Sequence, residues 1–333
     1  MSKIIDDLLK PEAYPEETKE VSLAQTHISN VFICDNFVYK LKKSVDFGFL
    51  DFSTLEKRKF YCEQEVELNN RFSEGIYLGV YPVTLDDENH VINGEGEIVE
   101  YAVKMKRLPI ENLLKSKLKE GKITSKDIKR VAEAVAAFHK SSRQAKEIDA
   151  FGKIEVIKFN TDENFSQTQE FIGKVITKKQ HADLKKWTND FYKKFKKLFE
   201  QRISDKKIRD CHGDLHMEHI CLTDPIIIFD CIEFNERFRY SDTASDIAFL
   251  LMDLEYNDGK DLAAELKKAY CEKTNEKDID HLIKFYKVYR AYVRGKVTSF
   301  MLNDPSITGE KGKQAMDTAK KYFNLAYSYI GED

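Results

Sequence analysis

The sequence predicts a two-lobed α+β fold in which an N-terminal antiparallel sheet carrying one helix is followed by a mainly helical part. Strand signals dominate residues 21–107 and are interrupted by one helical stretch near 54–72. From residue 109 onward the apolar residues keep helical spacing, except around one predicted hairpin. A chain of 333 residues is long enough to split into two lobes. We expect an N-lobe over residues 1–108 and a C-lobe over residues 109–333.

Composition and charge narrow the class of protein. The net charge of -3 gives no general attraction to nucleic acid or to an anionic membrane. The longest apolar run, Ile247 to Met252, is far shorter than a membrane span, and the N-terminal segment lacks the apolar core of a secretory signal. The six cysteines form no C-x-x-C pair. We therefore expect a cytoplasmic enzyme with reduced cysteines and without a nucleic-acid, membrane or protein partner.

A hairpin is predicted early in the N-lobe. Two apolar runs, Val31 to Cys34 and Phe37 to Leu41, are separated by Asp35-Asn36. Because side chains alternate along a strand, Lys40 and Lys42 are expected on one face of the second strand.

A helix should follow this hairpin. Ser53-Thr54-Leu55-Glu56 matches a capping box, which predicts a helix start. Glu63, Glu65 and Glu67 within that helix are candidate partners for a lysine.

The predicted strand Val99 to Met105 leads into Lys106-Arg107-Leu108-Pro109, where proline suits a helix start. Beyond it, apolar residues at helical spacing predict helices around residues 128–138 and 184–198.

The clearest chemical signal is the segment Cys211 to His219 together with the apolar run that ends at Asp230. It places Asp214 in a short loop and Asp230 on a strand sixteen residues later, with Thr223-Asp224-Pro225 as the turn between two strands. A tight hairpin would bring Asp230 back beside Asp214. Phosphoryl transfer needs one group to accept the proton of the attacking hydroxyl and one to hold a metal against the phosphates. The two carboxylates meet these needs.

The loop also carries a family resemblance. In the protein-kinase pattern H-R-D-L-x-x-x-N, His212, Asp214 and Leu215 match, Gly213 replaces arginine, and His219 stands where asparagine would be. The H-G-D variant resembles the aminoglycoside phosphotransferase and choline kinase branch of the protein-kinase-like superfamily. This resemblance implies a bilobal protein-kinase-like fold and an ATP- and Mg²⁺-dependent small-molecule kinase, with Mn²⁺ as an alternative ion. It also implies Asp214 as the catalytic base, with His212 holding the loop, and Asp230 as a metal ligand.

The same resemblance assigns nucleotide contacts in the N-lobe. Lys40, favoured over Lys42, would reach the phosphates and pair with Glu65. The loop 25–30 contains no glycine, so Thr26 or Ser29 would have to meet phosphate oxygens through hydroxyl or backbone groups. The strand exit at 105–108 would be the adenine hinge, with contacts assigned to Met105, Lys106 and Leu108. An ordinary linker would have the same sequence.

His219 and Asp246 leave alternatives open. Imidazole suits softer ions than Mg²⁺, so His219 either binds such an ion or only hydrogen-bonds Asp214 while Asp230 holds a single metal. Asp246 resembles the family's aspartate that braces the catalytic loop from the next helix, and it could equally be the N-cap of that helix.

The acceptor is the least determined part. Arg290 and Arg294 share a helix face at i, i+4, and paired arginines suit an anionic substrate. An exposed basic face of a packing helix is the alternative.

Two rival functions remain. His212, His216 and His219 could hold Zn²⁺ in a metallohydrolase, provided that a helix brought them together. A nucleotide-binding regulator without turnover is the other.

A closer resemblance concerns three segments, Lys40 to Ser53, His212 to His219 and Phe229 to Asn235. They are similar to uncharacterised bacterial aminoglycoside-phosphotransferase-like proteins, which often precede a P-loop kinase domain in one chain. No G-x-x-x-x-G-K-[ST] motif occurs here, so we expect a stand-alone form.

Overall fold

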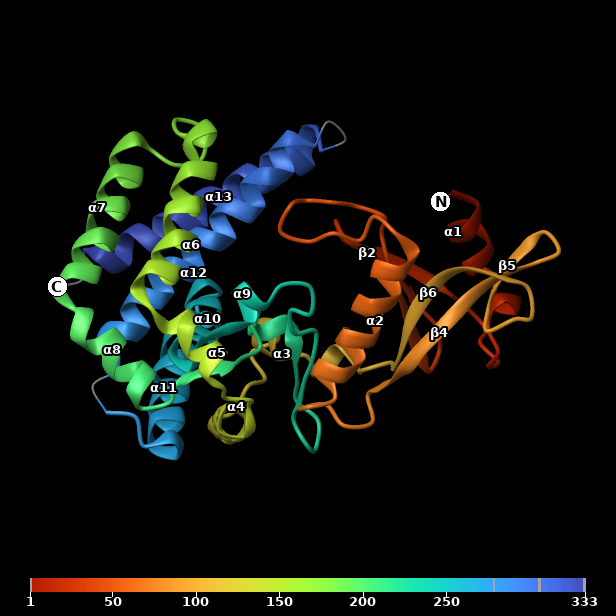
Figure 1. The fold of residues 1–333 in the computed structure, drawn as a ribbon, viewed down its shortest axis with the longest axis horizontal. Helices are drawn as coiled ribbons and strands as arrows, with labels where there is room; N and C mark the ends of the chain where they lie inside the picture. Colours follow the sequence, from red (N-terminus) through yellow and green to blue (C-terminus); the bar gives the residue numbers. More distant parts are fainter. Residues whose placement is uncertain (1, 278, 305–306, 332–333) are drawn as a thin grey trace. The chain divides into compact units, whose positions relative to one another are not determined.

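The computed structural model describes residues 2–277, 279–304 and 307–331, which divide into two compact units (Figure 1). The N-terminal unit holds the residues up to Glu120 together with Glu218–Glu236, and the C-terminal unit holds Gly121–Met217 and the residues from Arg237 onward. The compact units therefore differ from the predicted lobes, because the hairpin segment groups with the N-terminal sheet. The lobe boundary between residues 108 and 109, where strand signals give way to helical spacing, stays a prediction.

The N-terminal unit is built on a six-stranded antiparallel sheet in the order β1-β2-β3-β6-β4-β5. Its strands are β1 (Ser22–Gln25), β2 (Ser29–Ile33), β3 (Phe37–Lys42), β4 (Tyr77–Asp86), β5 (Asn89–Ile92) and β6 (Glu97–Lys106). The remaining elements of this unit are α1 (Ser2–Leu8), η1 (Pro11–Ala13), α2 (Leu55–Asn69), η2 (Ile110–Asn112), α3 (Leu114–Lys119), β8 (Ile220–Cys221) and β9 (Ile227–Ile228).

The two faces of this sheet are buried differently. Phe32, Tyr39 and Leu41 pack in one apolar cluster, whereas Val103 and Met105 belong to a second cluster with Cys62 of helix α2. The helix lies against strands β4 and β6 (Figure 1). Lys40 and Lys42 alternate with Tyr39 and Leu41, so both project toward the side of α2.

Helix α2 begins one residue later than the predicted capping box requires. Thr54, not Ser53, is the N-cap, and its hydroxyl accepts a hydrogen bond from the backbone N–H of Lys57. The predicted reciprocal pair of Ser53 and Glu56 is therefore wrong, because Glu56 lies in the first turn and not at the position facing the cap. The helix itself is confirmed over fifteen residues.

The C-terminal unit is mainly helical. Its helices are α4 (Ser125–Ser141), α5 (Lys146–Asp149), α6 (Ile154–Gln167), α7 (Lys178–Lys194), α8 (Lys196–Ser204), α10 (Thr243–Tyr256), α11 (Lys260–Thr274), α12 (Asp280–Phe300) and α13 (Gly309–Ile330). Short 3-10 turns η3 (Ala150–Gly152), η4 (Gln169–Phe171) and η6 (Met301–Asn303) join some of them. The turn η5 (Met217–His219) and helix α9 (Glu236–Arg239) start where the chain passes between the units, and β7 (Ile208–Asp210) pairs with β10 (Tyr240–Asp242).

Helix α10 is the central element of this unit. Every residue from Thr243 to Leu254 is buried, and α10 packs on α11 and α12, while α12 packs on α13. The surrounding aromatic cluster includes Phe165, Phe249, Tyr292 and Phe323. The predicted helix around 184–198 is interrupted at Phe195, where α7 ends and α8 begins.

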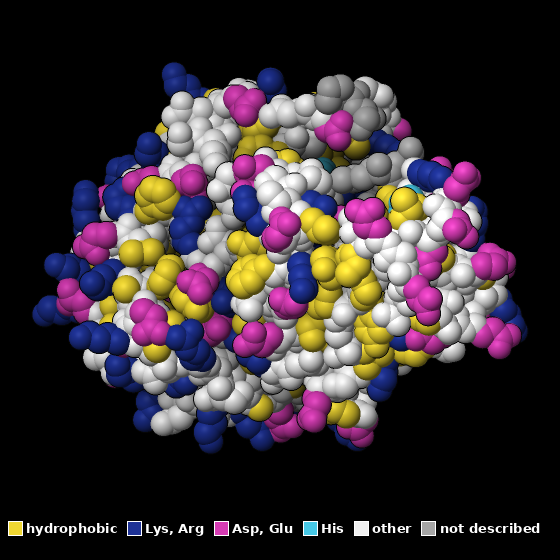
Figure 2. Space-filling model, turned by 45° about the vertical axis from the view of Figure 1, so that its right-hand side comes forward, with side chains coloured by type: hydrophobic (Ala, Val, Ile, Leu, Met, Phe, Trp, Pro, Cys, Tyr) yellow, Lys and Arg dark blue, Asp and Glu magenta, His cyan; other side chains and the backbone are white. Residues whose placement is uncertain are grey.

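The α+β prediction is thus confirmed: an antiparallel sheet with one long helix, followed by a mainly helical remainder. Figure 2 shows one face of the molecule, on which lysine and arginine side chains are interspersed with aspartate and glutamate. Within the described ranges, no helix combines the length and the apolar character needed to cross a membrane. The six cysteines are free, and five of them are buried.

Candidate active site

The predicted catalytic loop lies in the C-terminal unit and is held through its backbone. Gly213 has a positive φ of 83°, which glycine adopts without strain. The carboxylate of Asp246 accepts hydrogen bonds from the N–H groups of His212 at 2.7 Å and Gly213 at 2.9 Å. One buried side chain thus fixes both peptides that precede Asp214.

Asp246 stands in the first turn of α10 and is completely buried. The N-cap of this helix is Asp242, so the N-cap alternative for Asp246 is wrong. Burial favours the neutral carboxyl, but the hydrogen bond with His139 and the nearby positive charges hold the pKa of Asp246 below its usual value. The ring of His139 also hydrogen-bonds the hydroxyl of Tyr270 at 2.7 Å.

Arg290 completes the support of the loop from helix α12. Its Nη1 donates to the carbonyl of Gly213 at 2.7 Å, its Nε donates to Ser245, and its guanidinium lies over the ring of Phe249. The side chain is buried. The alternative of an exposed basic face is therefore wrong for Arg290, and its directed donors bind the loop and α10 instead of facing a substrate.

Arg294, one turn further, is partly buried and lies over the ring of Tyr322. Burial alone would lower its pKa, but Tyr322 and the carboxylate of Asp214 raise it. Arg290 and Arg294 thus have different surroundings, and their pairing at an anionic acceptor stays a prediction.

Asp214 itself keeps about a third of its side chain exposed. Its backbone N–H donates to Nδ1 of His212 at 3.3 Å, and its Oδ2 lies 3.4 Å from Nε2 of His216. Burial disfavours the charged imidazolium of His216, but the neighbouring Asp214 carboxylate raises the pKa of His216 above its usual value. The Asp214 carboxylate is thus partly exposed on a loop held through its backbone, with His216 beside it.

The segment that carries His212 and His216 is not a helix. The metallohydrolase alternative was argued for histidines on a helix, and that arrangement is absent from this described segment. His212 instead accepts the hydrogen bond from Asp214, and the ring of His216 packs on Phe249.

The predicted nucleotide and metal residues form a charged cluster in the N-terminal unit. Glu65 is completely buried on α2 and contacts two lysines of strand β3. Nζ of Lys40 lies 2.9 Å from its Oε1, and Nζ of Lys42 lies 2.7 Å from its Oε2. Lys40 also donates a 2.6 Å hydrogen bond to Oδ1 of Asp230. Each of the two lysines thus contacts a different oxygen of Glu65.

Glu233 is a member of this cluster that sequence reasoning missed. Its carboxylate pairs with Lys42 and is buried. Burial raises the pKa of Glu233, whereas its contact with Lys42 acts in the opposite direction. With two ammonium groups and three carboxylates, the cluster carries one negative charge in excess.

The prediction that Asp230 lies on a strand is wrong. Asp230 follows the short strand β9 and has a left-handed conformation with a φ of 62°. Its N–H donates to the hydroxyl of Tyr77 at 3.0 Å. The next N–H, that of Cys231, donates to Oδ1 of Asn69, whose Nδ2 donates to the carbonyl of Glu65. Among the described residues, the last backbone hydrogen bond of the pairing between the β8 and β9 segments runs from the N–H of Phe229 to the carbonyl of His219, one residue before the left-handed Asp230.

His219 lies in the same unit, with Nε2 3.4 Å from Oδ2 of Asp230. From the sequence, a softer metal ion or Asp214 was proposed as the partner of His219, and neither alternative named Asp230. The donor chemistry of the cluster fits Mg²⁺, because Asp230 is its most exposed carboxylate and Mg²⁺ prefers oxygen ligands.

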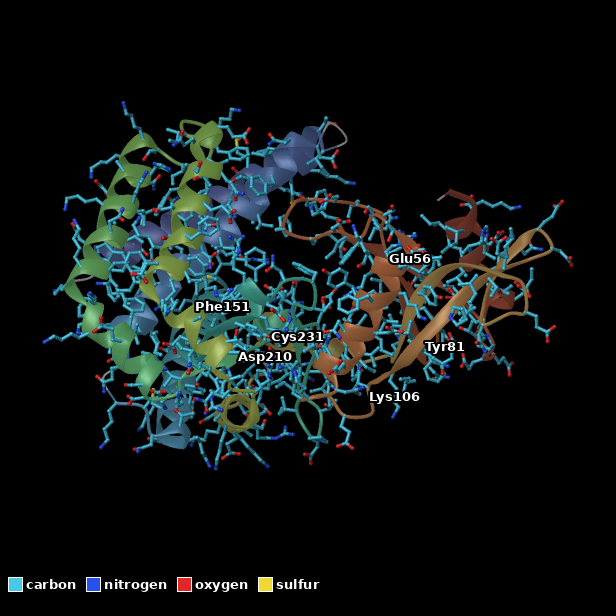
Figure 3. All side chains as sticks on the ribbon, in the orientation of Figure 1. Glu56, Tyr81, Lys106, Phe151, Asp210 and Cys231 are labelled. Carbon is cyan, nitrogen blue, oxygen red and sulfur yellow. The ribbon has the colours of Figure 1, made fainter. Side chains whose placement is uncertain are left out.

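The predicted flap and hinge residues lie on the same sheet. Ser29 opens strand β2 opposite Lys42, and its buried hydroxyl has no hydrogen-bond partner among the described residues. Met105 is buried near the end of β6, whereas Lys106, labelled in Figure 3, is exposed and donates its N–H to the carbonyl of Ile76. Residues 107–109 leave the strand without regular structure, and Leu108 is half-buried there.

Weak sequence signals did exist for the residues that were missed. Asn69 lies four residues after Glu65 on the same helix face, and Glu233 lies three residues after Asp230. Neither spacing reveals the partner, because the contacts of Glu233 with Lys42 and of Tyr77 with Asp230 join residues far apart in the chain.

Comparison with known proteins gives a consistent result. The sequence model of the phosphotransferase enzyme family matches residues 78–281. An uncharacterised protein of Mycobacterium tuberculosis (strain H37Rv) is 31% identical over 279 residues, covering 83% of this chain and 54% of that protein. An uncharacterised protein of Mycobacterium bovis matches to the same extent. The chain spans about half the length of these curated relatives.

Solved structures resemble the fold over nearly the whole chain. The GDP complex of aminoglycoside 2'-phosphotransferase-IIIa has a TM-score of 0.57 at 13% identity, covering 97% of this chain and 99% of that one. A spectinomycin phosphotransferase with ADP and spectinomycin has a TM-score of 0.51 at 13% identity and covers 95% of both chains. A choline/ethanolamine kinase family protein from Mesorhizobium loti has a TM-score of 0.51 at 12% identity, covering 94% and 92%. At these identities the likeness concerns the fold alone.

Proposed function

Because the chain belongs to the phosphotransferase enzyme family, we propose that it transfers the γ-phosphate of ATP to a hydroxyl group of a small molecule. The observation that carries this proposal is the position of the Lys40 ammonium, which lies within 3 Å of both Glu65 and Asp230. A lysine paired with a helix glutamate, next to a carboxylate that could hold a metal, is the set of groups that kinases use to position phosphates, which supports this proposal.

Asp214 acts as the catalytic base in this proposal. Its carboxylate is partly exposed, and its loop is fixed by Asp246 and Arg290 through backbone groups. Such a loop can hold the carboxylate at the acceptor hydroxyl without rearranging during the reaction. His212 supports the loop by accepting the N–H of Asp214.

Asp230 holds Mg²⁺, and His219 orients its second oxygen. The bound ion would neutralise phosphate charge and draw the phosphates into line for transfer. Lys40 binds the phosphates and Glu65 orients Lys40. The hydroxyl of Ser29 is completely buried, so it would donate to a phosphate oxygen only after the loop 25–30 had moved. Met105, Lys106 and Leu108 form the adenine side of the site.

The acceptor is a small molecule, as the names of the proteins with similar folds indicate for those proteins: an aminoglycoside, spectinomycin, and choline or ethanolamine. Arg294, which interacts electrostatically with Asp214, is the residue that would contact an anionic group of this acceptor. Within the proposal the enzyme works in the cytoplasm, where ATP is available.

The test compares the parent protein with Asp230→Asn and Asp214→Asn. Binding of ATP, ADP and GTP is measured by calorimetry with Mg²⁺ or Mn²⁺, and slow nucleotide hydrolysis is followed in the same samples. We expect Asp230→Asn to lose metal-dependent nucleotide binding. We expect Asp214→Asn to bind nucleotide normally while hydrolysis falls by roughly 10² to 10⁴.

Three outcomes contradict the proposal in different ways. Nucleotide binding without any hydrolysis in the parent would favour a non-catalytic regulator. Equal hydrolysis by Asp214→Asn and the parent would remove Asp214 as the base. Bound Zn²⁺ in stoichiometric amount without nucleotide affinity would favour a metallohydrolase.

A further inference from the structure

Glu65 divides its two carboxylate oxygens between two lysines with very different surroundings. Lys42 keeps 1% of its side chain exposed and lies between Glu65 and Glu233, whose side chains are 0% and 5% exposed. Lys40 keeps 14% exposed, and its second partner, Asp230, keeps 37% exposed. One lysine is enclosed by buried carboxylates, and the other lies where the cluster opens to solvent.

The contacts of Lys40 are suited to exchange. Its directed hydrogen bond goes to Asp230, whereas its contact with Oε1 of Glu65 is an ion pair without hydrogen-bond geometry. Asp230 is also the carboxylate with the best access for an incoming cation. An ammonium group and a divalent ion would therefore compete for the same oxygen.

The contacts of Lys42, in contrast, should stay in place when a ligand binds. Both of its carboxylate partners are buried, so that moving Lys42 away would leave charges without compensation in a region of low dielectric. Glu233 belongs to the segment that carries Asp230, and Lys42 belongs to strand β3. The pair therefore ties the Asp230 segment to the sheet, in parallel with the bond from Cys231 to Asn69 of helix α2.

We propose that the two lysines have separate tasks: Lys40 moves from Asp230 to the nucleotide phosphates when metal binds, while Lys42 and Glu233 form a fixed pair that positions Asp230 and Glu65. Lys42 and Glu233 are thus positioning residues and do not touch the substrate. This inference rests on the proposed function, because it assigns Asp230 to the metal.

The two tasks predict opposite effects on metal affinity. Removing the Lys40 charge frees Asp230 from a competing cation, so metal alone should bind more tightly even though nucleotide binds more weakly. Removing the Lys42–Glu233 pair together keeps the net charge of the cluster but releases the segment that carries Asp230. Metal and nucleotide should then both bind more weakly.

The experiment measures Mn²⁺ affinity by electron paramagnetic resonance without nucleotide, and Mg·ADP affinity by calorimetry, on three proteins and the parent. For Lys40→Met we expect Mn²⁺ to bind about threefold more tightly and Mg·ADP at least about tenfold more weakly. For the double variant Lys42→Met/Glu233→Gln we expect both affinities to fall, by about threefold or more. The matched control is Lys186→Met/Asp190→Asn, which removes a charge-balanced pair whose side chains are 78% and 50% exposed, and it should match the parent.

The outcomes separate the inference from the function on which it rests. If Lys40→Met and the double variant shift Mn²⁺ affinity in the same direction, the division of tasks is wrong although the protein still binds nucleotide. If the double variant fails to fold, a Lys40→Met protein that binds Mn²⁺ no more tightly than the parent overturns the inference by itself. A parent protein that binds neither Mn²⁺ nor Mg·ADP overturns both the inference and the proposed function.

Discussion

In the C-terminal unit the candidate catalytic loop is held by its backbone, whereas in the N-terminal unit the functional side chains hold one another. Asp246 and Arg290 bind peptide groups of residues 212 and 213, so that the side chain of Asp214 is left to act. Lys40, Lys42 and Glu65 instead use their charged groups on neighbouring charges. Backbone support holds a loop without using the Asp214 side chain, whereas side-chain support combines the partly exposed contact of Lys40 with the buried contacts of Lys42.

The largest expected effect comes from breaking the backbone support of the catalytic loop. In Asp246→Asn one amide oxygen replaces two charged acceptors, and the amide NH₂ faces a backbone donor. We expect the free energy of unfolding to fall by about 3 kcal/mol, and turnover to fall about 100-fold because the base is displaced. Denaturant unfolding and the hydrolysis rate measure the two effects.

A suitable control is Asp280→Asn, which changes the same group where 74% of the side chain is exposed. It should leave both quantities within error. If Asp246→Asn unfolded with the same denaturant midpoint as the parent protein, the carboxylate of Asp246 would not be needed to hold the loop.

The second effect concerns the other support of the same loop. In Arg290→Met the carbonyl of Gly213 and the hydroxyl of Ser245 lose a charged donor in a buried place. We expect a loss of about 2 kcal/mol in the free energy of unfolding, smaller than that for Asp246 because Asp246 holds two peptides. If Arg290→Met affected only the affinity for an acceptor and not stability, Arg290 would be a substrate residue after all.

A smaller effect is expected for the Asp230 segment. Tyr77→Phe removes the acceptor of the Asp230 N–H but keeps the ring in its apolar cluster. We expect a loss of about 1 kcal/mol and a rise in the Mg²⁺ concentration needed for half-maximal nucleotide binding. Tyr81→Phe makes the same change on the same strand and serves as the control. An equal Mg²⁺ requirement in both variants would show that the tyrosine hydroxyl does not position Asp230.

The smallest effect is expected for a surface ion pair that belongs neither to the candidate catalytic loop nor to the charged cluster. Lys186 and Asp190 form an ion pair on the surface of α7, where water screens the attraction. Lys186→Ala should change the free energy of unfolding by no more than about 0.5 kcal/mol. If Lys186→Ala lowered the free energy of unfolding as much as Arg290→Met, an exposed ion pair would contribute as much as a buried charged contact. That result would contradict the difference expected between them.

The sequence predicted the main elements of the fold where local patterns dominate. The apolar run 37–41 after the turn residues Asp35-Asn36 led to strand β3, and helical spacing around Val131 led to α4. Local patterns were less reliable at element ends. The helix cap was predicted at Ser53 but lies at Thr54, and strand β9 ends before Asp230, which was predicted to lie on it. The end of an element depends on tertiary contacts as well as on its own residues.

The sequence by itself therefore determined the local elements that hold the candidate residues: the loop containing Asp214, the strand containing Lys40 and Lys42, and the helix containing Glu65. Period-two and period-3.6 spacing are local, so they can be read without a structure. Only the tertiary structure decided how those residues are held. Glu233 pairs with Lys42 across 191 positions of sequence, and Arg290 binds Gly213 across 77, and no local pattern encodes such contacts.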